Sequence, residues 1–416
     1  MTSPTTNAPM IAIACGGTGG HLFPGLAVAE QLTQRGCVVT LLVSPKDVDQ
    51  QAVKSARGVE IVTLPAVALQ RGSRIAFFSG FAKSYLAARK HFKARPPQAA
   101  LAMGGFTSVP PVLAAKRLGA KTFLHESNTI PGKANRVLSR FVDCAFVGFP
   151  DAATKLKART SVVTGTPVRP QFQPGNRAAC CRELGLDPSR PVVLVMGGSQ
   201  GASGVNELLI RALPLFAQAV PHWQWLHLTG PNDAEKVRAA YASAKLAAIV
   251  HPFFTQMELA LGAADAAVTR AGASSLAEFA AMRLPSVLVP LPTSADNHQF
   301  FNARAFEQNG AARLLDQRTA TPEQIVLLLR ELVEAGEVRN GIQAALAKWH
   351  TPNAALEIAE QILASVGCAD STAEARWTQR GATAKNEPED LRRTKIKEAT
   401  VPNLCPPQIF GLTQDT

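Results

Sequence analysis

Two glycine-rich loops, one in each half of the chain, are the residues best suited to bind a phosphate. Gly16-Gly-Thr-Gly-Gly20 follows the apolar run Met10–Cys15, and Gly197-Gly-Ser-Gln-Gly201 follows the apolar run Val192–Met196. A short strand, a glycine turn and a helix expose backbone N–H groups at a helix N-terminus, where the helix dipole favours an anion. The loops therefore predict one nucleotide-binding unit in each half.

The residues around these loops exclude two common kinds of nucleotide site. A dinucleotide fingerprint requires glycine where this chain has Leu22, and Ser44 stands where an acidic residue would close the second strand. The second loop lacks the lysine of a Walker A loop, so triphosphate hydrolysis is not expected. A diphosphate bound without this apparatus indicates a nucleotide sugar.

His21 follows the first loop directly. An imidazole at the mouth of a phosphate loop is a candidate general base, and the alternative is a structural histidine at a helix start. Pro24 has the position of a proline at the first residue of a helix, so we expect a helix over residues 24–35.

Two polar clusters follow in the second half. Thr269–Glu278 reads as the end of a strand, a turn of small residues and a helix from about Ser274. The Glu278 carboxylate could accept both hydroxyls of a ribose, or could simply stabilise the helix N-terminus. The amide-rich run from Asp296 to Asn302 suits sugar hydroxyls, and its alternative is the polar face of a helix.

Strand-like and helix-like stretches alternate through both halves, which is the rhythm of parallel βαβ units. A helix is expected over Val109–Leu118 and a linker over Thr166–Asn176. We therefore predict an α/β chain with two Rossmann-like parallel-sheet domains. Besides the two strands that precede the loops, strands are expected at residues 38–43, 99–103, 121–125, 142–147, 223–229, 247–250, 266–269 and 286–289.

The net excess of positive charge is confined to the first half of the chain. Residues 1–170 hold 21 Lys and Arg against 7 Asp and Glu, whereas residues 171–367 hold 15 against 17. This excess favours an anionic partner, although a merely solubilising surface is the alternative. Between residues 71 and 95 basic residues alternate with apolar ones, which favours a membrane surface over nucleic acid. The apolar residues concerned are Ile75, Phe77, Phe78, Phe81, Tyr85 and Phe92.

Membrane spans and metal sites are not expected. No apolar run approaches the roughly 18 residues that cross a bilayer. The seven cysteines show no C-x-x-C and no metal-ligand spacing, which is typical of a protein of the reducing cytoplasm. No nucleic-acid-binding motif is visible.

Taken together, these residues resemble the MurG family of bacterial peptidoglycan N-acetylglucosaminyltransferases, over about residues 10–367. Each shared motif is short, but their joint order is specific. In chain order the motifs are Gly17-Thr-Gly-Gly-His21 with Phe23-Pro-Gly25, Met103-Gly-Gly105, His125-Glu-Ser-Asn128, Gly165-Thr-Pro-Val-Arg169, Gly197-Gly-Ser-Gln-Gly201, and Arg270-Ala-Gly-Ala273 with Glu278.

The resemblance implies the GT-B fold, in which two Rossmann-like parallel-sheet domains face each other across a cleft. Residues 10–168 would form the N-terminal domain that binds the acceptor and the membrane, and a helix at about 352–367 would join it. Residues 171–350 would form the C-terminal UDP-sugar-binding domain. Residues 368–416 have no counterpart in the family and are expected to be a disordered tail.

The resemblance also implies the reaction. An inverting transfer would move N-acetylglucosamine from UDP-N-acetylglucosamine to the C4 hydroxyl of the N-acetylmuramyl sugar of undecaprenyl-linked lipid I, forming lipid II. The expected location is peripheral, on the cytoplasmic face of the bacterial inner membrane. No metal or cofactor is expected, and no Asp-x-Asp metal motif is present.

Site residues carry over from the family by position. His21 would be the catalytic base, Phe254 would lie by the uracil, Glu278 on the ribose and Gln299 on the transferred sugar. Ser274-Ser275 replaces a bulkier pair, and His298 stands where an amide is usual. The residues that would bind UDP-N-acetylglucosamine are Thr18, Gly19, Gly20, Asn128, Arg169, Ser199, Phe254, Ala273, Ser274, Ser275, Leu276, Ala277, Glu278 and Gln299.

Two other functions remain open at this point. A UDP-N-acetylglucosamine 2-epimerase would share the scaffold but would need further carboxylates in its cleft, and the first half is poor in acid. A non-catalytic membrane-bound sensor of UDP-sugars would not require His21, Asn128 and Glu278 to be present together.

Overall fold

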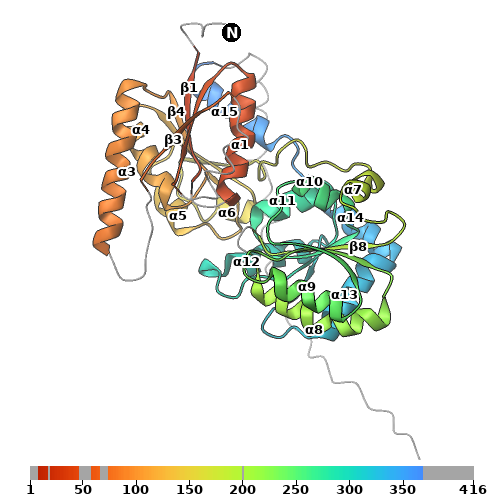
Figure 1. Cartoon of the computed structure of the whole chain (residues 1–416). Helices are drawn as coiled ribbons and strands as arrows, with labels where there is room; N and C mark the ends of the chain where they lie inside the picture. Colours follow the sequence, from red (N-terminus) through yellow and green to blue (C-terminus); the bar gives the residue numbers. More distant parts are fainter. Residues whose placement is uncertain (1–7, 17–18, 46–57, 66–73, 199–200, 369–416) are drawn as a thin grey trace, which may run out of the picture. The chain divides into compact units, whose positions relative to one another are not determined.

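The structure is a computed structural model, and it describes residues 8–16, 19–45, 58–65, 74–198 and 201–368 (Figure 1). Thr18, Ser199 and the expected tail after Cys368 lie outside the described residues. Every described strand belongs to one of two parallel sheets, which confirms the predicted α/β fold class.

The first sheet has seven described strands in the order β3-β2-β1-β4-β5-β6-β7. They are β1 Met10–Ala14, β2 Val38–Val43, β3 Glu60–Thr63, β4 Ala99–Ala102, β5 Lys121–Glu126, β6 Cys144–Val147 and β7 Thr160–Val163. Its helices are α1 Gly19–Gln34, α3 Arg74–Ala94, α4 Val109–Arg117, α5 Lys133–Leu138 and α6 Pro150–Ala153.

The second sheet has six described strands in the order β10-β9-β8-β11-β12-β13. They are β8 Val192–Met196, β9 Gln224–Leu228, β10 Ala247–His251, β11 Ala266–Thr269, β12 Ser286–Leu288 and β13 Arg313–Leu314. Its helices are α7 Arg177–Glu183, α8 Ser203–Ala219, α9 Ala234–Ser243, α10 Met257–Ala263, α11 Ala273–Met282, α12 His298–Gln308, α13 Pro322–Glu334 and α14 Gly336–Trp349.

Both sheets reverse their strand order beside the strand that precedes a glycine loop. β1 pairs with β2 on one side and with β4 on the other, and β8 pairs with β9 and β11 in the same way. In open parallel sheets, ligands bind outside the carboxyl ends of the strands at such a switch point. The topology therefore places both predicted phosphate loops at ligand-binding edges.

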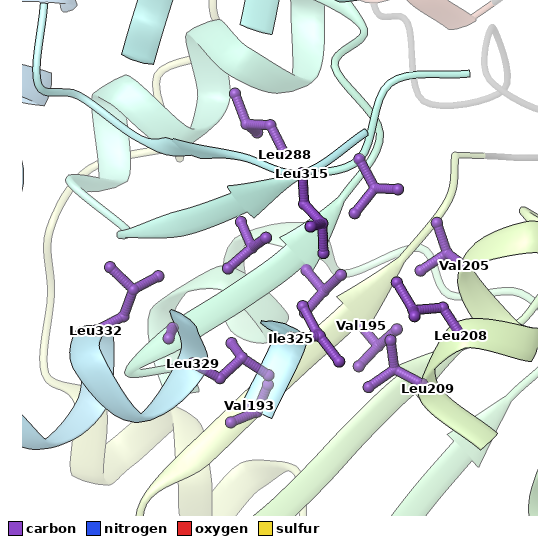
Figure 2. Close-up of a cluster of buried hydrophobic side chains, with 14 of the residues drawn as sticks. Val193, Val195, Val205, Leu208, Leu209, Leu288, Leu315, Ile325, Leu329 and Leu332 are labelled. Atoms are coloured by element: carbon purple, nitrogen blue, oxygen red, sulfur yellow. The ribbon is translucent and has the colours of Figure 1, made fainter. Parts of the chain in front are cut away.

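Helices cover the second sheet and close its core (Figure 2). Ile325, Leu329 and Leu332 of α13 lie with Val193 and Val195 of β8, and all of them are buried. β8 is buried along its whole length, as expected for a central parallel strand covered on both faces. The spacing of four and three on α13 is that of one helix face.

Helix α15, Ala354–Ser365, completes the core of the first domain although it follows the second domain in the chain. Its buried Ile358, Ala359 and Ile362 join Leu22 and Leu32 of α1 in one cluster. Figure 1 shows α15, in blue, beside α1, in red. The first domain therefore folds from both ends of the described chain.

Three strands were not predicted from the sequence, and all three lie at sheet edges. β3, β7 and β13 are only partly buried, so their sequences lack the continuous apolar run of a central strand. The expectation of a helix start at Pro24 was also wrong. Helix α1 begins at Gly19, and Pro24 lies inside it.

The core of the second domain predicts a clear difference between two leucines of α13. Leu329→Ala should lower the free energy of unfolding by about 2–5 kcal/mol, because Leu329 is fully buried and its truncation leaves a cavity. Leu327→Ala is the matched control, because Leu327 is 69% exposed and its loss should cost under about 0.5 kcal/mol. Urea unfolding measures both, and equal effects would contradict the assigned packing.

Candidate functional site

Gly16, the first residue of the first glycine loop, is held by close backbone packing. A Cβ at Gly16 would lie 2.5 Å from the backbone nitrogen of Ser44, at the end of β2, so no other residue fits. The Thr107 hydroxyl donates to the Gly16 carbonyl at 2.7 Å and ties the chain after β4 to this loop. The ends of β1 and β2 therefore position the start of α1 at the edge of the sheet.

His21 lies in the first turn of α1, and its ring packs against the backbone of Gly104 and Gly105. A Cβ at Gly104 would come within 2.8 Å of the imidazole Cδ2 and Nε2 atoms. Both glycines have positive φ, 119° and 76°, which favours glycine independently. The Met103-Gly-Gly105 motif thus forms the surface on which the candidate base rests.

His125, at the end of β5, is a neutral neighbour of His21. Its ring is fully buried, with Nε2 3.0 Å from the Gly165 carbonyl and Nδ1 3.3 Å from the Ser127 hydroxyl. Burial lowers the pKa of His125, although the hydrogen bond to Gly165 and the charge of Glu126 oppose this shift. A neutral ring donates through Nε2 and accepts at Nδ1 here, so His125 is structural.

Glu126 organises the loop that carries Asn128. Its buried carboxylate accepts hydrogen bonds from the backbone N–H and the side-chain Nδ2 of Asn128, both at 2.9 Å. It also accepts from the Gly132 N–H and from Asn135 Nδ2, each at 2.9 Å. Four donors compensate the burial of the carboxylate and hold the Asn128 side chain in one orientation.

Asn302, on α12, joins this loop to the second domain. Its Oδ1 accepts from the Thr129 N–H at 3.0 Å and from the Thr129 hydroxyl at 2.9 Å. Its Nδ2 donates to Asn128 Oδ1 at 3.0 Å and to the Ala271 carbonyl at 3.1 Å. The amide is fully buried and uses its whole hydrogen-bonding capacity.

Helix α11 begins where β11 ends, at the edge of the second sheet. Arg270 is buried between them and donates to the carbonyls of Val289 and Pro290, at 2.9 and 3.2 Å. Burial lowers the pKa of Arg270 to about 10, so it remains charged at neutral pH. Arg270 therefore fixes the turn before α11, and the first N–H groups of α11 have no partner within the helix.

The N-termini of α1 and α11 meet. The Ser274 hydroxyl, in the first turn of α11, donates to the Gly20 carbonyl, in the first turn of α1, at 2.7 Å. Each N-terminus carries roughly half a positive charge. Two such ends in contact create a site that favours an anion.

Arg169 and Glu278 add charges of opposite sign. The Arg169 guanidinium lies 4.5 Å from the ring centre of Phe23, on α1, and 4.9 Å from that of Phe172. Its Nε is buried, and no described residue accepts a hydrogen bond from it. Burial raises the pKa of the Glu278 carboxyl to about 7, while the charge of Arg169 opposes this rise and that of Glu258 adds to it.

The remaining predicted residues make contacts within the second domain. Gln299 Oε1 accepts from the Leu291 N–H at 2.9 Å, and His298 Nδ1 lies 2.7 Å from the Ala295 carbonyl. The Phe254 ring lies 5.3 Å from that of His251, in the connection after β10. Ser275 lies beside Ser274 in the first turn of α11.

A pocket between the domains has three of the predicted residues in its wall. Gly165 and Thr166 contribute from one side, and Ala273, Leu276 and Ala277 from α11. His21 is not part of its lining. Leu276 is 1% exposed and packs into the core of the second domain.

Sequence reasoning missed the roles of Glu126, Asn302 and Ser274. Glu126 lies in the His125–Asn128 motif and Asn302 in the amide-rich run from Asp296, but their hydrogen-bond partners are set by the fold. Nothing in the sequence near Asn302 points to Thr129, which lies 173 positions away. Pro24 was the one available signal for the contact of Ser274 with Gly20. A proline at position 24 has no N–H to donate to the Gly20 carbonyl within the helix.

Comparisons with known proteins agree on one family. Residues 11–147 match the glycosyltransferase family 28 N-terminal domain, and residues 192–361 match its C-terminal domain. A protein of Acidithiobacillus ferrooxidans (strain ATCC 53993 / BNL-5-31) is 37% identical over 368 residues, which cover 88% of this chain and 100% of that protein. Its name is UDP-N-acetylglucosamine--N-acetylmuramyl-(pentapeptide) pyrophosphoryl-undecaprenol N-acetylglucosamine transferase. A protein of Anaeromyxobacter sp. (strain K) with the same name is 34% identical, over 84% of this chain and 91% of that one.

Solved structures show the same relationship. The crystal structure of Acinetobacter baumannii MurG matches with a TM-score of 0.65 and 30% identity, over 86% of this chain and 99% of that one. A UDP-N-acetylglucosamine 2-epimerase has the same TM-score of 0.65 but only 14% identity, so it shows the fold alone. The identity that extends over most of both chains shows that this protein belongs to the MurG family of glycosyltransferases.

Proposed function

We propose that this protein transfers N-acetylglucosamine from UDP-N-acetylglucosamine to the C4 hydroxyl of the N-acetylmuramyl sugar of lipid I, which forms lipid II. One observation carries the proposal most directly. The N-termini of α1 and α11, one from each domain, are in contact through Ser274 and Gly20. An anion with several oxygen atoms, such as the diphosphate of a nucleotide sugar, stabilises two positive helix ends together.

Residues around this contact suit the other parts of the donor. Arg169 adds a positive charge beside α1. Its buried Nε–H, which has no acceptor among the described residues, would donate to an oxygen of the nucleotide sugar. Glu278, farther along α11, would accept the two ribose hydroxyls when ionised. Asn128 is already oriented by Glu126 and Asn302, so its binding to the donor costs little ordering.

His21 is the proposed general base. The acceptor C4 oxygen attacks the anomeric carbon of N-acetylglucosamine, its proton passes to the imidazole, and the bond from the anomeric carbon to the diphosphate oxygen breaks. UDP leaves with the electron pair, and the helix N-termini and Arg169 stabilise its developing charge. The packing of His21 on Gly104 and Gly105 holds the ring in place for this step.

The epimerase alternative shares the fold but has less support. The epimerase structure resembles this chain at 14% identity only, whereas proteins named as the transferase reach 37%. Incubation with UDP-N-acetylglucosamine, with and without a lipid I analogue, tests the choice. UDP release that depends on the acceptor supports the transferase, and conversion to another UDP-sugar without acceptor would overturn it.

Helix α3 is the proposed membrane contact. Ile75, Phe78 and Leu86 are 85%, 64% and 59% exposed, and their spacing places them on one face. Three exposed lysines accompany them, at positions 83, 90 and 93. The described residues contain no helix that is both long and apolar enough to cross a bilayer. An exposed apolar stripe with basic flanks is typical of peripheral binding to anionic lipid.

The opposite face of α3 corrects the expected set of lipid-facing residues. Phe81 and Tyr85 pack against the core of the first domain, and Phe92 is 1% exposed. Phe77 packs edge-to-face on Phe106, with ring centres 5.4 Å apart. The membrane proposal therefore rests on Ile75, Phe78 and Leu86 alone, because an α-helix turns its other face to the protein.

His21→Ala should lower kcat by about a hundredfold or more, as expected for the loss of a general base, with little change in donor KM. Gly104→Ala should act in the same direction, because its Cβ would displace the His21 ring. Steady-state kinetics with UDP-N-acetylglucosamine and a lipid I analogue measure both.

Gly119→Ala is the matched control for backbone strain. Gly119 has φ 91°, similar to the positive φ of Gly104, but a Cβ added at Gly119 would meet no atom within 4 Å. Normal turnover by folded His21→Ala would remove His21 from the catalytic role. Equal losses of kcat in both glycine variants would show that Gly104→Ala acts through backbone strain and not through the His21 ring.

The raised pKa of Glu278 predicts that UDP binding depends on pH. Below about pH 7 the carboxyl is protonated, so binding to the ionised form must release a proton. UDP affinity should therefore rise about tenfold from roughly pH 6 to pH 8 and then level off. Calorimetric titration with UDP at several pH values measures this.

Two variants isolate Glu278 as the titrating group. Glu278→Gln should bind UDP more weakly at high pH and lose the dependence, because an amide does not titrate. Glu258→Gln should shift the rise to lower pH, because the charge of Glu258 helps to raise the pKa of Glu278. A wild-type affinity that is constant with pH would contradict the ribose role.

Membrane binding should depend on the exposed face of α3. Phe78→Ser/Leu86→Ser should bind vesicles of phosphatidylglycerol and phosphatidylcholine much more weakly than wild type in co-sedimentation. Added salt should weaken wild-type binding, because the lysine contribution is electrostatic. Leu327→Ser, a change at a similarly exposed position in the second domain, should leave binding unchanged. Equal binding by all three proteins would rule out the assigned surface.

A further inference from the structure

Pro24 leaves one carbonyl of α1 without its helical donor. In an α-helix the N–H of residue 24 would donate to the carbonyl of residue 20, and proline has no N–H. Pro24 is buried inside α1, and Gly20 lies on the exposed first turn. The Gly20 carbonyl is therefore free to accept a hydrogen bond from a donor outside the helix.

Ser274 supplies that donor from the second domain. Its hydroxyl donates to the Gly20 carbonyl at 2.7 Å and joins two residues that are 254 positions apart. The same contact opposes an electrostatic cost, because the N-termini of α1 and α11 carry like partial charges and repel each other. A hydrogen bond at this point offsets the repulsion until an anion neutralises it.

A second, stronger contact holds the domains at another place. The buried Asn302 amide makes four hydrogen bonds that join α12 to Thr129, Asn128 and Ala271. Loss of the Ser274 bond leaves this contact intact. The domains can therefore separate at α1 and α11 without coming apart at Asn302.

We infer that Pro24 and Ser274 form an interdomain latch that holds the N-termini of α1 and α11 together before the donor binds. Ser274 is then a positioning residue that acts through Gly20. A protein without the latch must bring the two helix ends together during binding, and this cost lowers the affinity for the diphosphate. The latch itself does not depend on the identity of the ligand, whereas its effect on donor affinity rests on the proposed function.

Ser274→Ala, Ser274→Thr, Pro24→Ala and Ser274→Ala/Pro24→Ala test the latch. Small-angle X-ray scattering without ligand should show a larger radius of gyration for Ser274→Ala than for wild type. Ser274→Thr retains the hydroxyl and should restore the wild-type value. Urea unfolding checks that each variant is folded. Unchanged scattering in folded Ser274→Ala would overturn the latch.

The effect of the latch on donor binding is tested by measuring the affinity for UDP by calorimetry. Ser274→Ala should weaken UDP binding about twofold to tenfold, which corresponds to the loss of one neutral hydrogen bond, and Ser274→Thr should recover it. In the Pro24→Ala background, the restored helical N–H gives Gly20 another donor, so Ser274→Ala should weaken UDP binding less. Full additivity of the two changes would overturn the coupling of Pro24 to Ser274.

Failure of the proposed function gives a different pattern. If wild type does not bind UDP, the donor assignment falls, while the scattering of the ligand-free variants still decides the latch. If wild type binds UDP but Ser274→Ala is unchanged in both affinity and scattering, the latch falls and the donor assignment stands.

Discussion

The fully paired amide of Asn302 is the interaction on which the rest of the site depends. A buried amide is costly unless each donor and acceptor finds a partner, and the partners of Asn302 come from the loop after β5 and from the turn before α11. Satisfying all of these groups together keeps α12 packed against the loop after β5. In the same structure the N-termini of α1 and α11 are in contact through the Ser274 hydroxyl and the Gly20 carbonyl.

Charge and hydrogen bonding in this site are balanced for a ligand that carries both phosphate and hydroxyl groups. The helix ends and Arg169 favour negative charge, while Glu278, on the same helix as Ser274, stays near its point of half-ionisation at neutral pH. Burial and Glu258 raise its pKa, and Arg169 opposes them. The groups proposed to bind the diphosphate and the ribose therefore lie on different turns of α11.

Glycine is needed in this site because neighbouring atoms pack closely against it, and not because it is flexible. Gly16 lets the first loop pass directly against the end of β2, and Gly104 leaves room for the His21 ring. In both places a single methyl group would collide with backbone or imidazole atoms. The positions of the candidate base and of its helix therefore depend on glycines, which have no side chain to fill the space. The sequence shows these glycines as short motifs but does not show which atoms pack against them.

The alternation of buried apolar runs with helical stretches determined the two parallel sheets, because central strands covered on both faces must be apolar throughout. The edge strands β3 and β13 were not predicted, because they are only partly buried and their residues need not be apolar. The motif order identified the family, and the glycine loops predict the sites of phosphate binding. Only the tertiary structure decided that α1 starts at Gly19, that the Asn302 amide bridges the domains and that Ser274 reaches Gly20. The physical reason is that local pattern encodes which residues are buried, whereas pairing between residues more than a hundred positions apart depends on how complete domains pack.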